Sequence, residues 1–143
     1  MTAQTSPDFQ DSSTAAAQVA EWLDALADTL SQRRLEAIPD LFEADCFWRD
    51  FLAFTWNIKT VEGAALVQEM LSHALPRMDG PISWVLDRAS VQIEGDVVSA
   101  WFRFETAVGR GQGHLRLRAG RCWTFFTALR AVSYTHLTLP TKA

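Results

Sequence analysis

The sequence predicts an α+β domain in which three helices pack on one curved antiparallel sheet. Three observations support this fold class. Helical periodicity dominates the first third of the chain, and short apolar segments separated by turn signals fill residues 82–132. Between these regions, residues 46–58 are rich in aromatic and apolar side chains but form no helical face, as expected of a strand. Helices followed by a run of strands favour a sheet covered by helices.

The first predicted helix covers residues 14–30 and begins at an N-cap within residues 12–14. Acidic residues occupy one side of it. Five large apolar side chains share the other side at helical spacing: Val19, Trp22, Leu23, Leu26 and Leu30. This face is expected to pack on the sheet.

Two shorter helices follow. The second covers residues 34–43 and contains Pro39, which can begin a fresh turn because its missing N–H is harmless there. The third is expected to begin at Thr60 as its N-cap, with Glu62 in the first turn. Pro76 helps to end it.

The last part of the chain reads as a meander of four strands: residues 82–93, 97–106, 114–118 and 121–132. Turn residues at 94–96 and 119–120 predict two of the connections. The glycines of GRGQG, residues 109–113, predict the third hairpin turn. Asp87 and Arg88 interrupt the first strand, which favours a bulge or a structural ion pair there.

The composition excludes several classes of function. The 143 residues carry a formal net charge of −4, which argues against a partner that is nucleic acid. The apolar runs are too short to span a membrane, and the N-terminus lacks the pattern of a signal peptide. Cys46 and Cys122 have no metal-ligand spacing, so buried free thiols in a cytoplasmic protein are expected, with no metal.

The chain divides into three parts. Residues 1–13 are predicted to be a disordered leader, and residues 14–132 form the domain. Residues 133–143 resemble the translated sequencing-adapter ends of truncated reading frames. We therefore expect this tail to be non-native and the natural sequence to continue differently after Val132.

Asp50 is the candidate catalytic residue. In a strand it shares one face with Cys46 and Trp48, where aromatic neighbours would desolvate its carboxylate and suit it to act as a general base. The alternative is a structural carboxylate that pairs with an arginine or caps a backbone turn. His114 alternates with arginines and His73 lies late in a helix, so neither is a convincing partner for it.

Six aromatic side chains are expected to line the concave side of the sheet: Trp48, Phe54, Trp56, Trp84, Trp101 and Trp123. We expect Trp48 and Trp56 to be largely buried. Such residues could surround a small apolar ligand or pack as a solid core, and the sequence leaves both alternatives open.

The order of these elements resembles the cone-shaped nuclear transport factor 2-like fold, of which the SnoaL-like domains are examples. Two stretches, CFWRDFLAFTWNIKTVEG at residues 46–63 and GHLRLRAGRCWTFFTAL at residues 113–129, are similar to the N-terminal domain of flavin-containing monooxygenase-like oxidoreductases. The resemblance covers roughly residues 15–132. In those proteins this domain precedes a module that binds FAD and NADPH, so the resemblance implies these cofactors for a parent chain. No dinucleotide-binding motif lies in this sequence, and no cofactor is expected in it.

The resemblance implies an accessory domain without turnover of its own, whose partner is the flavin module of the parent chain. Two alternatives remain open. One is a free-standing SnoaL-like cyclase or ketosteroid isomerase-like enzyme that uses Asp50 as its acid/base carboxylate. The other is a module that forms a homodimer through the outer face of the sheet.

Overall fold

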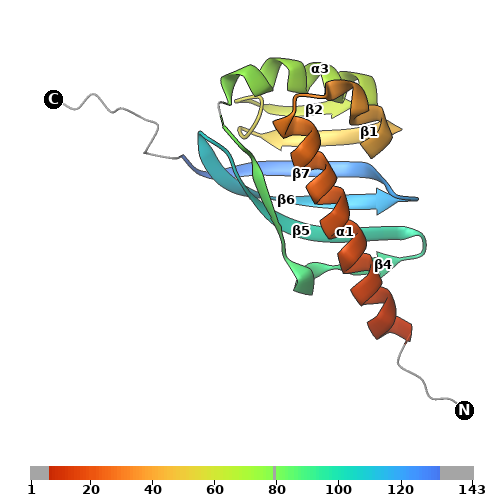
Figure 1. Ribbon diagram of the computed structural model, residues 1–143. Coiled ribbons are helices and arrows are strands. Elements are labelled where there is room, and N and C mark those ends of the chain that lie inside the picture. Colours follow the sequence, from red (N-terminus) through yellow and green to blue (C-terminus); the bar gives the residue numbers. More distant parts are fainter. Residues whose placement is uncertain (1–6, 79, 133–143) are drawn as a thin grey trace, which may run out of the picture.

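A computed structural model describes residues 7–78 and 80–132 (Figure 1). Its α-helices are α1 (Pro7–Ser31), α2 (Ile38–Leu41) and α3 (Ala64–Ala74). Single 3₁₀ turns lie at η1 (Leu35–Ala37), η2 (Leu75–Arg77) and η3 (Arg88–Ser90). The strands are β1 (Phe42–Phe51), β2 (Ile58–Glu62), β3 (Ser83–Leu86), β4 (Gln92–Glu94), β5 (Val97–Glu105), β6 (Gly109–Arg118) and β7 (Arg121–Val132). The predicted tail, residues 133–143, lies outside the described residues.

The strands form one curved sheet in the order β2-β1-β7-β6-β5-β3, and β4 pairs with another part of β5. The predicted α+β class and the cone-shaped fold are confirmed. One detail differs, because β1 runs parallel to β7 and the sheet is therefore mixed. The other pairings are antiparallel, including the predicted hairpin at residues 94–96 and the turn at 119–120.

Helix α1 crosses the concave face of the sheet, while α3 lies beside β1 and β2 (Figure 1). The five apolar side chains predicted to face the sheet from α1 are all in the buried core. The helix begins at Pro7, so the predicted start within residues 12–14 is wrong. Proline at the first helical position costs no hydrogen bond, which permits the earlier start.

The second and third helices are shorter than predicted. Of residues 34–43, only η1 and the four residues of α2 are helical, and Phe42 already begins β1. Pro39 lies in the first turn of α2, as expected. Thr60 and Glu62 do not begin α3 but lie in β2, where Thr60 pairs with Arg49 of β1. A glycine with a positive φ of 91°, Gly63, separates β2 from α3.

The predicted hairpin turn at residues 109–113 is wrong, because these residues begin strand β6. The turn lies just before them, where Thr106 N donates a hydrogen bond of 2.7 Å to Gly109 O. Gly111 and Gly113 share the inner face of β6 and pair with Phe104 and Phe102 of β5. Without side chains, they leave room for these two rings to lie across the strand.

In the described part of the chain, the strand is interrupted at Asp87 and Arg88, but by a 3₁₀ turn and not by the predicted bulge or ion pair. The chain leaves the sheet after β3, makes the 3₁₀ turn η3 and returns as β4 on the same edge of β5. Two hydrogen bonds join this turn to Trp101, and a third closes the turn itself. Asp87 N donates to Trp101 O at 3.0 Å, Trp101 N donates to Ser90 Oγ at 2.8 Å, and Ser90 Oγ donates to Asp87 O at 2.6 Å.

Candidate functional site

Asp50 lies on β1, faces the interior and has no exposed surface. Its carboxylate accepts four hydrogen bonds. Oδ2 accepts from Phe54 N at 2.9 Å, from Thr55 N at 2.8 Å and from the Thr55 hydroxyl at 2.9 Å. Oδ1 accepts from the Thr127 hydroxyl at 2.6 Å. Two carboxylate oxygens offer about four acceptor sites, so these donors occupy them.

The donors to Oδ2 come from the loop that joins β1 to β2. The loop closes on itself through a hydrogen bond of 3.0 Å from Leu52 N to Asn57 O. Leu52 and Trp56 both have positive φ, 67° and 62°, which is uncommon for residues other than glycine. Asp50 therefore holds a strained loop in place by binding its backbone N–H groups, as an aspartate often does in a turn.

Thr127 joins Asp50 to the aromatic interior. It lies on β7, directly opposite Asp50 in the parallel pairing. Its hydroxyl donates to Asp50 and accepts a hydrogen bond of 2.9 Å from Trp48 Nε1. This Trp48–Thr127–Asp50 network is buried and supplies the indole with the partner that a buried Trp normally requires.

The interior of the cone is occupied by aromatic rings. Trp48 and Phe54 are in contact, with ring centroids 5.2 Å apart, and Phe54 stacks on Trp84 at 6.2 Å. Rings from β5 and β7 surround them: Phe102, Phe104 and Phe125. The Trp84 indole N–H is buried and has no hydrogen-bond partner among the described residues. Three of the six predicted lining residues thus meet in this interior.

The other three lie elsewhere. Trp56 is in the β1–β2 loop and is 38% exposed, so the expectation that it is largely buried is wrong. Trp101 is 43% exposed on the outer face of β5, where its ring contacts His114 with centroids 4.8 Å apart. Trp123 is half-buried at an irregularity in β7. The guanidinium carbon of Arg118 lies 4.3 Å from the centroid of its ring. Without the register, a strand residue cannot be assigned to a face.

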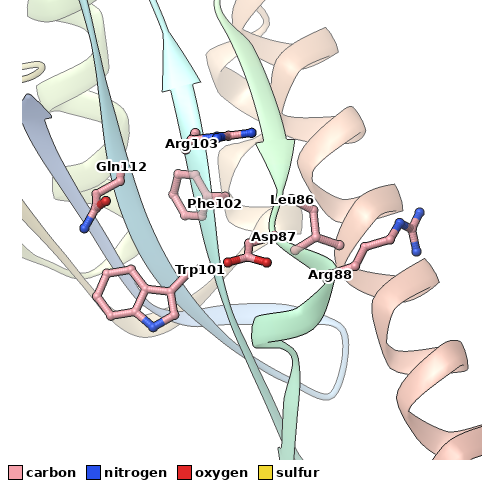
Figure 2. Close-up of a pocket in the computed structure, with 7 residues that line it drawn as sticks. All are labelled: Leu86, Asp87, Arg88, Trp101, Phe102, Arg103 and Gln112. Carbon is pink, nitrogen blue, oxygen red and sulfur yellow. The ribbon is translucent and has the colours of Figure 1, made fainter. Parts of the chain in front are cut away.

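Trp101 lines a hollow of about 640 Å³ on the outer side of the sheet. Figure 2 shows its lining, in which Asp87, Trp101 and Gln112 come from three neighbouring segments. Arg103 also borders an adjoining hollow of about 350 Å³. The hollows on the outer face are open to solvent, whereas aromatic rings fill the interior of the cone.

Within the described residues, the sheet carries one ion pair and several groups whose pKa values are shifted. Glu43 and Arg118 form an ion pair of 2.6 Å, and the hydrogen bond from Arg118 holds the pKa of Glu43 below its usual value. Burial, with the nearby charge of Arg116, lowers the pKa of His114. Burial raises the pKa of Cys46 to about 11 and also raises the pKa of Cys122 well above its usual value, so both stay as neutral, free thiols.

We expect His114 to make stability depend on pH. Its folded-state pKa is lowered, so its contribution is complete above the unfolded value near 6.5 and decreases as pH falls through that value. The His114→Gln variant should therefore lose less melting temperature than the wild type between neutral pH and the mildly acidic range. Glu43 also has a lowered pKa, so its contribution is lost only at more acidic pH. Thermal melts of the wild type and of the His114→Gln variant across this pH range would test the expectation. Equal decreases of melting temperature in the two proteins would contradict it.

Among the described residues, no group of three or more His, Cys, Asp or Glu side chains is placed to hold a metal ion. Within residues 7–78 and 80–132, no helix is long and apolar enough to cross a bilayer.

Solved structures with the same architecture define the fold class. A putative aromatic ring hydroxylase from Novosphingobium aromaticivorans superposes with a TM-score of 0.62 at 16% identity, over 84% of this chain and 92% of the other. The beta subunit of a putative aromatic-ring-hydroxylating dioxygenase from the same organism gives 0.58 at 20% identity, over 82% and 90%. An NTF2-like protein of unknown function from Mesorhizobium loti gives 0.51 at 17% identity, over 80% and 93%.

The chain therefore has the nuclear transport factor 2-like fold. Identities at this level establish the fold alone. No family profile matches the sequence, and no curated protein matches it.

Proposed function

We propose that this chain is a non-catalytic accessory domain of an oxygenase. The observation that carries the proposal is the carboxylate of Asp50, which is buried and accepts four hydrogen bonds from the protein itself. A general base must reach the proton that it removes from a substrate. Asp50 instead serves to hold a loop.

The rival proposal, a free-standing cyclase or isomerase, requires Asp50 to face a cavity. Phe54 and Trp84 occupy the adjacent interior as a stacked pair. A substrate would have to displace these rings and also release Asp50 from Thr55 and Thr127. The geometry favours the accessory role because it requires neither change.

The proposed parent is a flavin-containing monooxygenase-like protein. The two stretches that carry this resemblance, residues 46–63 and 113–129, meet in the fold. The first contributes Asp50 and its loop, and the second contributes Thr127. The shared motifs are then explained as one structural network that the accessory domain needs in order to fold. Of the solved structures with this fold, one is named as a putative aromatic ring hydroxylase and another as the beta subunit of a putative aromatic-ring-hydroxylating dioxygenase. These names agree with this setting but do not assign it.

The outer face of the sheet is the surface by which such a domain would contact its flavin module. It exposes large apolar side chains on four strands: Phe47, Ile58, Val85 and Trp101. Exposed apolar side chains gathered on one face are typical of an interaction surface. The same observation supports the second candidate, a homodimer through this face. Sedimentation of the wild type and of the Trp101→Ser variant would distinguish the two candidates. A dimeric wild type that becomes monomeric in the variant would support the homodimer, and a monomeric wild type would support contact with the flavin module.

We predict that the purified chain retains neither FAD nor NADPH, because it has no dinucleotide-binding fingerprint. Near-ultraviolet and visible absorbance after gel filtration, with added FAD and NADPH, checks this. Stoichiometric flavin would contradict the prediction.

The gene itself provides the decisive test of the accessory role. Genomic sequencing across the codons of residues 125–143 should show a reading frame that continues into a G-x-G-x-x-G fingerprint. A stop codon close after residue 132, together with turnover of a ketosteroid or a cyclisable polyketide by the pure chain, would overturn the proposal in favour of the enzyme.

A further inference from the structure

We propose that the hollow between β2 and the end of α3 binds a compact oxyanion of the phosphate or sulfate type. Three nitrogen-bearing side chains from three elements line it: Lys59 from β2, His73 from the last turn of α3 and Arg77 from η2. Ammonium, imidazole and guanidinium groups are the donors that tetrahedral oxyanions prefer. The hollow has a volume of about 200 Å³, which accommodates such an ion.

In the described part of the chain, no carboxylate lines this hollow. Glu69 lines the adjoining hollow of about 350 Å³, together with Lys59 and His73. Within residues 7–78 and 80–132, the only ion pair joins Glu43 to Arg118. Within this hollow, Lys59 and Arg77 therefore share the lining with no carboxylate, although the whole chain carries a net charge of −4. An anion bound there would be attracted by both positive charges.

The apolar part of the lining decides between a compact oxyanion and a larger organic acid. Phe54, Met70 and Ala74 form the floor and are each less than a tenth exposed, so they offer little surface to an apolar body. The remaining wall is polar and includes Thr55, whose hydroxyl is fixed by its hydrogen bond to Asp50. The site therefore selects charge and oxygen geometry, and an aromatic ring on the anion should add little affinity.

The test is a titration of the full chain with sodium sulfate at constant ionic strength, in which binding is monitored through the backbone amide chemical shifts. We expect saturable shifts centred on Thr55, Lys59 and His73. The Lys59→Gln/Arg77→Gln double variant should weaken sulfate binding by about tenfold or more, because both full charges are lost. Inorganic phosphate and phenyl phosphate should bind comparably to sulfate, while benzoate should bind no more tightly. Tighter binding of phenyl phosphate than of inorganic phosphate would overturn the assignment to a compact oxyanion.

The matched control is Arg103→Gln/Arg116→Gln, which removes the same charge from the outer face of the sheet. We expect it to change sulfate affinity by less than about twofold, since exposed charges beyond a Debye length are largely screened. Equal weakening by both double variants would mean that only the overall charge matters and would overturn the proposal. Non-saturating shifts, or tighter binding of benzoate, would also overturn it. Far-ultraviolet spectra confirm that each variant is folded.

Discussion

The Gly113→Ala variant is expected to lose about 3 kcal/mol of stability, an overpacking cost at the upper end for core substitutions. A Cβ at this position would collide with the carbonyl oxygen of Phe126 on β7 and with the ring of Phe102 on β5. The backbone oxygen cannot turn aside as a side chain could. The sheet must therefore deform between β6 and both of its neighbours. Denaturant unfolding, with the midpoint and slope measured together, gives the free energy directly.

Gln112→Ala is the matched control for Gly113→Ala. Gln112 is the adjacent residue of β6, and its side chain projects from the outer face. Its truncation creates no collision and should change the free energy of unfolding by no more than about 0.5 kcal/mol. If Gly113→Ala were as stable as this control, the close approach of β5 and β7 to the glycine would be refuted.

The second large effect is expected for Asp50→Asn, which should lower stability by roughly 1–3 kcal/mol. The change preserves shape but replaces one accepting oxygen by an amide NH₂. If the NH₂ replaces Oδ1, it faces the Thr127 hydroxyl, which already accepts a bond from Trp48. If it replaces Oδ2, three donors lose their acceptor. Either orientation leaves buried donors mispaired.

Asp24→Asn, the same change on the exposed side of α1, serves as the control and should be nearly neutral. Melting curves of the three proteins, run beside an activity screen, distinguish the two roles of Asp50. A stable Asp50→Asn variant that abolishes a measurable wild-type turnover would show that Asp50 is catalytic.

The periodic elements could be predicted from the sequence, because their signals are local. The apolar face of α1, the turn at residues 119–120 and the span of β7 all follow from spacing over a few residues. The glycines of β6 were misread because glycine is typical of turns. Their recurrence at every second position, the period of a strand, was the signal that could have identified them.

The candidate site depended on information that is not local. Asp50 stood out as a carboxylate among aromatic residues, but its role is decided by Thr127, which is 77 residues further along the chain. A threonine in an apolar strand was the available hint, and only the pairing of β1 with β7 shows what it binds. The position of Trp101 on the outer face likewise depends on the register with β6.

The parallel pairing of β1 with β7 also affects how the chain reaches its native state. β1 can pair with β2 soon after it is synthesised, but its other partner, β7, is the last strand of the described residues. One side of β1 therefore stays unpaired until almost the whole domain has been made. Contacts of such high sequence separation slow folding, because a long loop must close before they form. During translation, the aromatic face around Trp48 remains uncovered until β7 leaves the ribosome. Nascent chains released before Thr127 should therefore be the species that chaperones bind and that aggregate.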